Sequence, residues 1–468
     1  MAKKKILLLS DDLRMSSGVG TVSKNFVLGT IHKYDWVQAG GAIKHPEEGK
    51  IVDMNESIRK DTGVKDASLK IYPISGYGSQ ELLRQLMNVE KPDAILHYTD
   101  PRFWVWLYQM EHEIRQNIPI FYYNIWDDLP YPRYNENFYE SSDLIMNISK
   151  QTVNIVEQVS RNKPRTDWDC TYVPHGIPEK TFFPIDNDNK ELKSFRQKVI
   201  RNSDKDFIIF WNNRNIRRKL PSDVIMAYKT FCDNLPKEKA EKCLLLMHTA
   251  PKDNNGTDLP EVVKNICPDY DVIFSHQRLD DKHLNFLYNL ADIQVNIASN
   301  EGFGLGTAEA IMAGTPMIVN VTGGLQDQCG FKLKKYNSDK SGFTEEFLTS
   351  DDYSEIKTLH DWRKWENNND LSWGEWVKPV WPKTRALQGS PPTPYIFDDR
   401  ADWVDVSERI YDWYKMDKDE RESCGLKGRE FTMTEEIGMS GEQMSKNFIK
   451  DMDKMFEIWK PRKRYSIF

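Results

Sequence analysis

Short apolar segments of strand length alternate with segments of helical pattern through most of the chain, and this alternation restricts the possible folds more than any other feature. Strands that alternate with helices form parallel sheets covered on both faces. The alternation occurs in two series, so the sequence predicts an α/β protein with two doubly wound domains. The expected strands are "KKILLLS", "DAILHY", "PIFYYNI" and "DLIMNIS" in the first series, and "DFIIFWNN", "KCLLLMHTA", "YDVIFSH", "DIQVNIAS" and "TPMIVN" in the second.

The length of the chain agrees with two domains, because 468 residues exceed the size at which one hydrophobic core stops growing, about 250–300 residues. A segment rich in Pro, Asp and Asn, "YVPHGIPEKTFFPIDNDNK", separates the two series, as a domain linker does. We expect an N-terminal Rossmann-like domain over residues 1–190 and a C-terminal one over residues 200–415.

Composition excludes several classes of protein. The net charge of -7 argues against a protein that coats nucleic acid through bulk electrostatics, although a local basic groove stays possible. The longest apolar runs are too short to cross a bilayer, so we expect no stable membrane insertion. The six cysteines form no CxxC pair and no metal-finger spacing, which is typical of free thiols in a reducing cytoplasm. We therefore expect a cytoplasmic protein.

Residues 331–394 interrupt the alternation, and we interpret them as an insertion in the second domain. This stretch ends in "GSPPTP" and is rich in tryptophan. The tryptophans could stack on sugars or bases, form a small core of their own or make an oligomer contact, and the structural interpretations are favoured. The five residues are Trp362, Trp365, Trp373, Trp376 and Trp381.

The stretch "NEGFGLGTAEAIMAGTPMIV" joins an expected strand to an expected helix through a loop with three glycines. Free backbone N–H groups at a helix N-terminus, approached closely through glycines, form an anion site. Glu301 lies in the loop and Glu309 in the first turns of the helix, and carboxylates at such positions can accept hydrogen bonds from sugar hydroxyls. An alternative is that Glu309 only favours the helix dipole and the glycines only turn the chain.

A second stretch, "WNNRNIRRKLPSDV", directly follows the expected strand "DFIIF". It places Arg214 and Lys219 beside a strand end, with two further arginines between them. Two such cations can hold a diphosphate and stabilise it as a leaving group. The alternative is a solvated basic loop, which is the more common fate of a run of charge.

Taken together, the two stretches resemble the C-terminal domain of retaining glycosyltransferases of the GT-B fold, specifically glycosyltransferase family four. The resemblance depends on the Arg-x4-Lys pair, the Glu-x7-Glu motif that starts with "EGFG", and the following "AGTPMIV…GG". "VPHGIPEKTFFP" resembles the linker of that family, and "SSGVGTVSKNF" resembles its N-terminal glycine loop. The resemblance implies two domains facing a cleft, with helices of residues 416–468 crossing back onto the N-terminal domain.

The resemblance also implies a role for each matching residue. Glu309 would bind the ribose of a nucleotide and Glu301 the hydroxyls of the donated sugar. Arg214 and Lys219 would hold the diphosphate. The backbone of the glycine loop would assist from the same domain, and the N-terminal glycine loop from the other. The residues of these two loops are Phe303, Gly304, Leu305 and Gly306 in the first, and Gly18 and Gly20 in the second.

One position departs from the family pattern. Members of the family often carry a histidine near the sugar in the N-terminal domain, where this chain has Trp126, followed by Asp127 and Asp128. His97, at the end of "DAILHY", is a candidate catalytic residue in its place, and a structural histidine is the alternative. The sequence indicates no catalytic metal, because the Asp-x-Asp pairs lie in the linker and in a terminal helix.

The resemblance predicts a retaining, metal-independent glycosyltransferase that needs no cofactor and uses a UDP- or GDP-sugar as co-substrate. The acceptor would be a glycan or a lipid-linked glycan. An alternative is a hydroxymethylated DNA base, because some phage DNA glucosyltransferases share the fold, with "RNKPR" and "KPRKRYSIF" tracking phosphates. Further alternatives are a nucleotide-sugar epimerase and an inactive sugar-nucleotide-binding subunit. The sequence does not specify the oligomeric state.

Overall fold

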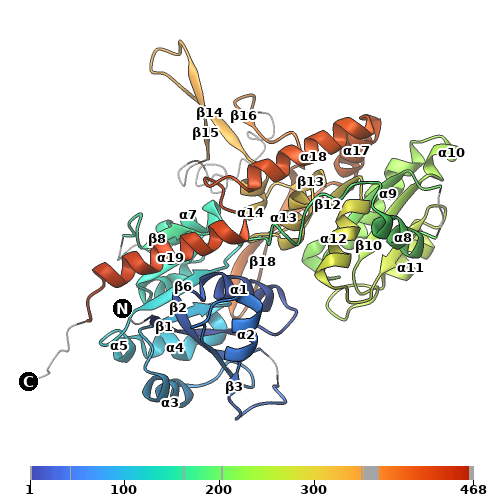
Figure 1. Ribbon diagram of the computed structural model, residues 1–468. Coiled ribbons are helices and arrows are strands. Elements are labelled where there is room, and N and C mark those ends of the chain that lie inside the picture. The colour runs from blue at the N-terminus through green and yellow to red at the C-terminus, as the bar shows by residue number, and fades with distance from the viewer. Residues whose placement is uncertain are drawn as a thin grey trace, which may run out of the picture.

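The computed structural model describes residues 3–42, 44–160, 162, 164–201, 204–348, 352 and 368–462. It contains two α/β domains, seen side by side in Figure 1. The N-terminal domain is built on an eight-stranded sheet in the order β3-β4-β2-β1-β5-β6-β7-β8. Its strands are β1 (Lys4–Asp11), β2 (Tyr34–Gly41), β3 (Val52–Asp53), β4 (Leu69–Pro73), β5 (Ala94–Tyr98), β6 (Ile120–Asn124), β7 (Leu144–Asn147) and β8 (Cys170–Tyr172). All neighbouring pairs are parallel except β3 and β4.

Helices cover both faces of this sheet, and the side chains of β1 show why. Ile6 and Leu8 belong to a core that also contains residues of α1 and α19, whereas the alternate residues Leu7 and Leu9 belong to a core shared with α3 and α4. A strand buried on both faces is apolar at consecutive positions, as Ile6–Leu9 are. The helices of this domain are α1 (Gly18–Thr30), α2 (Asn55–Thr62), α3 (Gln80–Glu90), α4 (Val105–Gln109), α5 (Glu111–Ile114), α6 (Glu136–Glu140) and α7 (Lys150–Val159).

The C-terminal domain has a parallel six-stranded sheet in the order β11-β10-β9-β12-β13-β17. The prediction of two doubly wound domains is therefore confirmed. The strands are β9 (Phe207–Asn212), β10 (Cys243–His248), β11 (Val272–Ser275), β12 (Ile293–Asn296), β13 (Met317–Asn320) and β17 (Val377–Val380). The helices are α8 (Lys190–Val199), α9 (Pro221–Asp233), α10 (Lys237–Ala240), α11 (Leu259–Ile266), α12 (Asp281–Leu290), α13 (Leu305–Met312), α14 (Gly324–Gln328) and α17 (Trp403–Lys415).

The interval 331–394, expected as an insertion, contains more than one kind of structure. β14 (Lys332–Tyr336), β15 (Phe343–Phe347) and β16 (Leu371–Ser372) form a small separate sheet, part of which projects from the molecule in Figure 1. β17, however, pairs with β13 and is the last strand of the main sheet, so part of the interval belongs to the domain itself. β18 (Pro382–Ser390) and β19 (Thr393–Ala401) then form a two-stranded hairpin.

The tryptophans of this interval that the structure describes serve mainly as core. Trp376 is buried, its ring centroid lies 4.8 Å from that of Phe431, and its indole N–H donates to the Gln328 carbonyl at 3.1 Å. Trp381 is also buried, whereas Trp373 is partly exposed. Trp362 and Trp365 lie outside the described residues.

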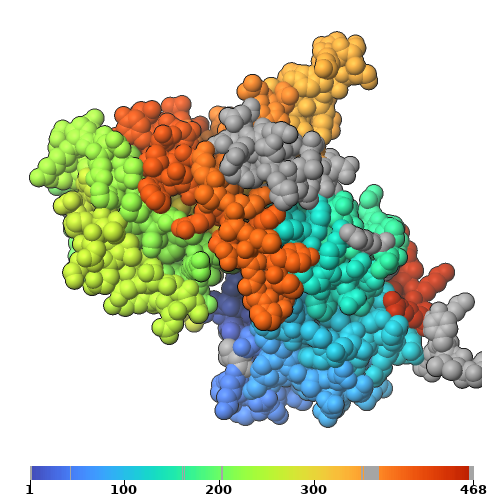
Figure 2. All heavy atoms as spheres, turned by 180° about the vertical axis from the view of Figure 1, so that it is seen from behind, coloured from blue at the N-terminus to red at the C-terminus, as the bar shows by residue number. Residues whose placement is uncertain are grey.

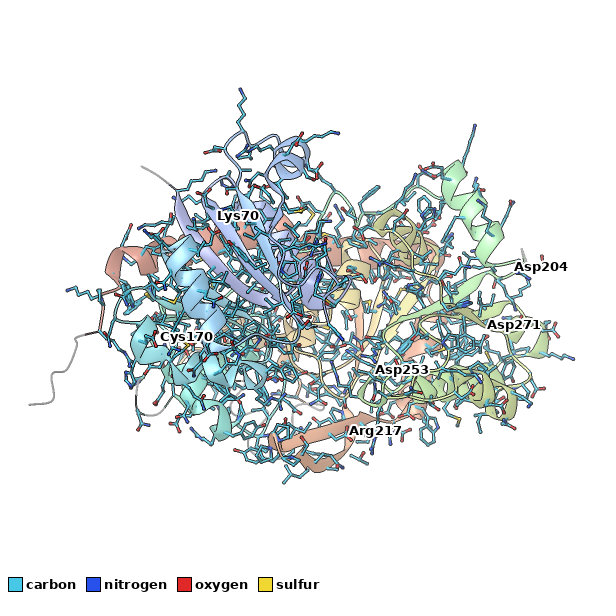
Figure 3. The ribbon with its side chains drawn as sticks, turned by 90° about the horizontal axis from the view of Figure 1, so that it is seen from below. Lys70, Cys170, Asp204, Arg217, Asp253 and Asp271 are labelled. Atoms are coloured by element: carbon cyan, nitrogen blue, oxygen red, sulfur yellow. The ribbon has the colours of Figure 1, made fainter. Side chains whose placement is uncertain are left out.

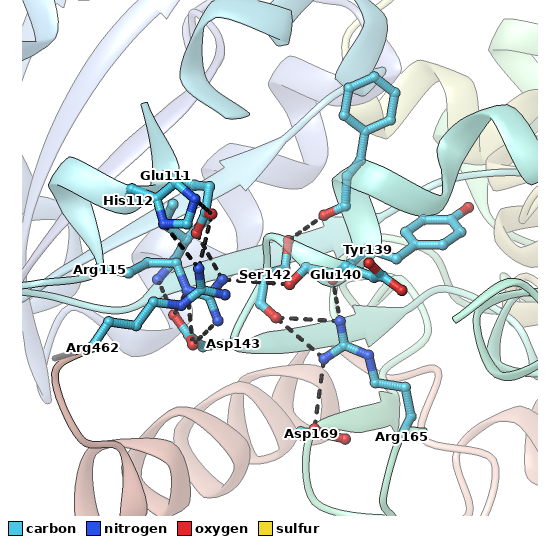
Figure 4. A network of polar contacts seen from close by, with 12 residues as sticks. Glu111, His112, Arg115, Tyr139, Glu140, Ser142, Asp143, Arg165, Asp169 and Arg462 are labelled. Carbon is cyan, nitrogen blue, oxygen red and sulfur yellow. Dashed lines mark hydrogen bonds and ion pairs between the residues drawn. The ribbon is translucent and has the colours of Figure 1, made fainter. Parts of the chain in front are cut away.

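The end of the chain returns to the N-terminal domain, as the resemblance implies. α18 (Lys418–Thr432) packs against α13 of the C-terminal domain, and α19 (Gly441–Ile458) packs against α1. Figure 4 shows how Arg462, beyond α19, joins an ion-pair network of the N-terminal domain, where its Nη1 lies 2.9 Å from Glu111 Oε1. Among the described helices, none is both long enough and apolar enough to cross a membrane. All six cysteines are buried free thiols.

Candidate active site

The glycine loop of the C-terminal domain runs from the end of β12 to the start of α13, as predicted. Gly304 is the N-cap residue of α13 and has a φ of +87°, a left-handed conformation that favours glycine. The first turn of α13 closes on the Gly304 carbonyl, which accepts from Thr307 N at 3.0 Å and Ala308 N at 3.1 Å. The loop thus presents the N-terminus of α13, with Leu305 and Gly306 as its first residues, at the carboxyl edge of the sheet.

Glu301 is buried in this loop and is surrounded by groups that stabilise its charge. Its Oε1 contacts Lys219 Nζ and accepts a hydrogen bond of 3.2 Å from Asn296 Nδ2. Arg218 Nη1 lies 3.8 Å from Oε2. Burial alone would raise the pKa of Glu301, but the charges of Lys219 and Arg218 outweigh it and hold this pKa below its usual value. Glu301 is therefore an ionised carboxylate with a fixed orientation.

The two glycines of "VTGG", Gly323 and Gly324, pack against the backbone of the loop that carries Glu301. Gly324 N donates to the carbonyls of Glu301 and Gly302, both at 3.1 Å. A Cβ atom on Gly323, whose φ is +49°, would stand 1.8 Å from the Glu301 carbonyl oxygen. A side chain therefore cannot be accommodated at Gly323 without displacing the loop that carries Glu301.

Glu309, the second glutamate of the motif, lies in the second turn of α13. It is partly exposed and has a different environment from Glu301. Tyr288 OH donates to Glu309 Oε2 at 2.6 Å, and Asn212 Nδ2 donates to the same hydroxyl at 2.6 Å. Burial raises the pKa of Glu309 to about 7, and the Tyr288 hydrogen bond only partly offsets this rise. Gly306 is packed against the same group, since a Cβ there would lie 3.1 Å from the Asn212 carbonyl oxygen. The two glutamates of the motif thus have opposite shifts in pKa.

The basic loop contributes two cations to Glu301, and one of them differs from the predicted pair. Lys219, one of the predicted pair, is buried against Glu301. Arg214 is exposed, with its Nε 3.0 Å from Asp253 Oδ2. Arg218, which the sequence analysis did not select, instead approaches Glu301 and donates to the Asn300 carbonyl at 2.6 Å. Figure 3 labels Arg217, which belongs to the same basic loop, and Asp253, the partner of Arg214.

The N-terminal glycine loop meets α13 across the domain boundary. A Cβ on Gly18, the first residue of α1, would lie 3.3 Å from Leu305 Cδ1. Gly20 serves the loop itself, because a Cβ there would lie 2.6 Å from the Met15 carbonyl oxygen. Gly18 is therefore placed between the domains, whereas Gly20 shapes the turn that brings it there; their approach to a donor stays a prediction.

His97 is fully buried at the end of β5 and has a structural environment. Its Nδ1 lies 2.8 Å from Tyr108 OH, its Nε2 lies 3.1 Å from Thr99 Oγ1, and its ring stacks on Tyr122. Burial lowers its pKa to about 3, so the imidazole is neutral at pH 7. The structural alternative describes these contacts better than the catalytic one.

Another histidine, His175 of the linker "VPHGIP", touches the glycine loop instead. Its ring centroid is 4.9 Å from that of Phe303, and its Nδ1 lies 2.8 Å from Tyr123 OH. Burial lowers the pKa of His175 to about 3. Phe303 is itself buried, so only its backbone can face a ligand. The sequence offered "VPHGIP" as a linker but gave no signal that its histidine supports the loop.

Asp127 brings the N-terminal domain to the site. It follows β6, and its Oδ2 lies 4.0 Å from Arg218 Nη1. Burial raises the pKa of Asp127, Arg218 lowers it, and Glu301 raises it further. Trp126, at the position where the family often has histidine, is buried, and its indole N–H donates to the Asp128 carbonyl at 2.7 Å. The side chain next to the missing histidine is therefore the one that faces Glu301 and Arg218.

A cavity of about 680 Å³ lies beside these residues. Its walls come from the basic loop, the start of α9, the loop 254–257, the hairpin β18–β19 and Asp127 of the N-terminal domain. Among the described residues, no cluster of three or more His, Cys, Asp or Glu side chains could hold a metal ion. The arrangement therefore offers paired carboxylates, cations and a helix N-terminus at a domain interface.

Comparison with solved structures defines the class of protein first. HepE of Anabaena, solved in complex with UDP and glucose, is 11% identical, with a TM-score of 0.62, and the match covers 96% of this chain and 100% of that one. Sucrose-phosphate synthase from Thermosynechococcus elongatus is 14% identical, with a TM-score of 0.61 and coverage of 97% and 100%. An Escherichia coli structure described as trehalose-6-phosphate with bound UDP-2-fluoro glucose is 12% identical, with a TM-score of 0.61 and coverage of 96% and 99%. The chain has the GT-B fold of these proteins.

Sequence comparison then gives the family. Residues 207–364 match the family described as "Family 4 Glycosyltransferase in conflict systems". This match, over about a third of the chain, and the GT-B fold both support a family 4 glycosyltransferase. A search among curated proteins found no match.

Proposed function

We propose that the protein transfers a sugar from a nucleoside diphosphate sugar to an acceptor hydroxyl with retention of anomeric configuration. The proposal rests on one observation above all: Glu301 is a buried, ionised carboxylate whose orientation is fixed by Lys219 and Asn296 beside the N-terminus of α13. A carboxylate of this kind is suited to accept hydrogen bonds from the hydroxyls of the donated sugar.

The other residues of the site would each bind a different part of the donor. Glu309 accepts hydrogen bonds from the ribose, and the backbone N–H groups of residues 303–306 face the diphosphate at the N-terminus of α13. Lys219 and Arg218 carry positive charge beside Glu301, where negative charge develops on the leaving diphosphate. Arg214, exposed on the same loop, reaches the diphosphate from the solvent side. Gly18 lets the N-terminal domain approach the donor closely.

The reaction can be written without a metal, a cofactor or a protein general base. The bond between the anomeric carbon and the diphosphate oxygen breaks, and a bond between that carbon and the acceptor oxygen forms on the same face of the sugar. The acceptor proton passes to the leaving phosphate. The cations of the basic loop stabilise the charge that this phosphate gains before it is protonated.

UDP-glucose is the donor that we propose first. The HepE structure contains UDP and glucose, and the Escherichia coli structure contains UDP-2-fluoro glucose. GDP-sugars are the second choice. The activity is thus a hexosyl transfer in the first instance.

The acceptor is proposed to be a glycan or a lipid-linked glycan. A hydroxymethylated DNA base is the alternative. The matched family is described as belonging to conflict systems, which is compatible with such an acceptor. Two of the cations expected to track DNA, Arg165 and Arg462, are engaged within the protein, however. Arg165 of "RNKPR" is buried, with Nη1 3.2 Å from the Ser142 carbonyl, and Arg462 of the tail binds Glu111, while residues 463–468 lie outside the described part. An epimerase and an inactive binding subunit are the remaining alternatives.

Donor binding and turnover test the proposal in sequence. Thermal unfolding with UDP, GDP, ADP and their glucose conjugates should show the largest stabilisation with UDP-glucose or UDP, since a ligand stabilises the state that it binds. Release of UDP from UDP-glucose should then be lost in Glu301→Gln and retained in Asp188→Asn, which changes an exposed carboxylate of the linker. Unchanged turnover in Glu301→Gln would contradict the proposal. An isomerised donor would favour the epimerase, and donor binding without turnover would favour the inactive subunit.

A further inference from the structure

The hairpin β18–β19 reaches from the C-terminal domain onto the N-terminal domain. It follows the edge strand β17 and leads into α17, so both of its ends are held by the C-terminal domain. Its two strands pair only with each other within the described part of the chain. Figure 2 shows this hairpin, in orange, lying across the boundary between the two domains.

Contacts along β19 attach the hairpin to the N-terminal domain. Phe397 N donates to the Leu129 carbonyl at 2.6 Å. Tyr395 OH donates to the Tyr131 carbonyl at 3.1 Å, and Tyr134 OH donates to the Tyr395 carbonyl at 2.9 Å. The rings of Tyr134 and Tyr395 pack edge to face, with centroids 5.0 Å apart. The hairpin is therefore an ordered wall that joins the domains.

A cavity of about 460 Å³ lies between the tip of this hairpin and the carboxyl ends of β5 and β6. Its volume falls within the range of small-molecule pockets, about 300–1,000 Å³. Asp127, Gln388 and Ile396 line both this cavity and the larger one beside the basic loop. Since Asp127 is 4.0 Å from Arg218, and Arg218 is 3.8 Å from Glu301, the smaller cavity adjoins the catalytic centre from the N-terminal side.

The lining of the smaller cavity has the chemistry of a saccharide site. Gln388, Ser390 and Thr393 of the hairpin line the cavity together with Asp127 of the N-terminal domain. They offer amide, hydroxyl and carboxylate groups to a ligand rich in hydroxyls. Trp126 and Ile396 also line the cavity and give part of its wall an apolar character, as is typical of ligand pockets.

The charges of the lining favour a neutral ligand. The Arg102 guanidinium is already paired with Asp100, with Nε 2.8 Å from Oδ1, and it also lies over the Trp126 ring at 5.3 Å. Asp127 is paired as well, with its Oδ2 4.0 Å from Arg218 Nη1, so the cations near the lining are already engaged by carboxylates and offer little to a phosphate backbone. A neutral sugar needs no such cation.

We propose that this cavity is the acceptor subsite, that it takes a neutral saccharide, and that Gln388 and Ser390 at the hairpin tip determine which saccharide is accepted. This inference rests on the proposed glycosyl transfer, and it specifies the acceptor class that the transfer uses. The hairpin supplies acceptor contacts from the same domain that holds the donor, so the subsite is complete only when the two domains are joined by β19.

Binding of sugars to the full-length protein tests the inference. Saturation-transfer NMR in the presence of UDP would use maltose, cellobiose, lactose and mannobiose as probes, and a duplex with 5-hydroxymethylcytosine as the rival ligand. We expect at least one disaccharide to bind, and its Kd to increase about tenfold or more in the Gln388→Ala/Ser390→Ala double variant, because two hydrogen bonds are lost. Leu387→Ala is the matched control, since Leu387 lies on the same strand but is 63% exposed and outside both cavities.

The outcomes separate this inference from the proposed function. Failure of every disaccharide to bind, an equal Kd in the double variant and in Leu387→Ala, or binding of the duplex in their place would each overturn the inference. The affinity for UDP-glucose, measured on the same samples, should be unchanged in the double variant, which also checks that it is folded. Absence of UDP-glucose binding and hydrolysis in the unmodified protein would instead contradict the proposed function, and the saccharide titration would still decide the subsite.

Discussion

Donor binding should depend on pH through Glu309. Burial raises the pKa of this carboxyl to about 7, from an ordinary value of 4.5. Ribose hydroxyls donate hydrogen bonds, so the ionised carboxylate is the form that binds them, and a proton on Glu309 competes with the donor. Affinity must therefore rise as the pH rises through 7. UDP-glucose suits the measurement because its diphosphate, esterified at both ends, has no proton that titrates in this range.

The magnitude follows from the fraction of ionised Glu309. With a pKa of about 7, roughly one molecule in eleven is ionised at pH 6 and roughly ten in eleven at pH 8. The Kd of UDP-glucose should therefore be about tenfold larger at pH 6 than at pH 8, which corresponds to about 1.4 kcal/mol. Binding at pH 6 should also release almost one proton per donor bound.

Isothermal titration calorimetry at pH 6, 7 and 8, repeated in buffers of different ionisation enthalpy, measures both quantities. Glu309→Gln should bind more weakly at pH 8 and show no such pH dependence. Tyr288→Phe removes the hydrogen bond that lowers the pKa of Glu309, so its affinity profile should move to higher pH. The same profile in Glu309→Gln as in the unmodified protein, or an affinity that increases toward pH 6, would refute the assignment of Glu309 to the ribose.

Two further predictions concern stability and the glycine loop. Lys219→Met leaves the buried Glu301 carboxylate without its ammonium partner and should lower the free energy of unfolding by about 3–5 kcal/mol. Arg214→Met breaks an exposed ion pair and should cost less than about 1 kcal/mol; equal losses in urea unfolding would contradict this difference. Gly323→Ala must displace the loop that carries Glu301, so UDP-glucose hydrolysis should fall at least about tenfold, as for a misplaced catalytic group. Gly49→Ala, at another glycine of positive φ that has open space around it, is the control and should keep its hydrolysis rate.

The strands of both sheets could be predicted from the sequence because their burial is a local property of the chain. "KKILLLS" and "DFIIFWNN" are apolar on both faces, and in the structure alternate residues of each strand enter two different cores. The turn before α13 was predictable for a similar reason, since a glycine at the N-cap tolerates the left-handed conformation that the turn needs. β17, in contrast, is a short "VKPV" strand between tryptophans, and its pairing with β13 has no local pattern.

The sequence predicted which loops carry the candidate site, because those motifs are local. It did not predict which side chains of the basic loop point toward Glu301, because the backbone geometry of the loop determines that. Spacing along the chain suggested Arg214 and Lys219 as a pair. The short 3-10 turn Arg217–Lys219, followed by Leu220 at a φ of +51°, directs Arg218 and Lys219 to Glu301, while Arg214 lies on the exposed side of the loop. Side-chain direction within such a turn depends on backbone dihedral angles that residue spacing does not specify.

By itself, the sequence determined the two doubly wound domains, the glycine loop between β12 and α13 and the two glutamates of that loop, because hydrophobic periodicity and glycine turns act over a few neighbouring residues. The tertiary structure decided which charges meet. It placed Arg218 beside Glu301, brought Asp127 from the other domain, buried His97 among aromatic rings and laid the hairpin β18–β19 across the boundary. The strength of these contacts depends on burial and distance, which exist only once each domain has folded and, for Asp127 and the hairpin, once the two domains have packed together.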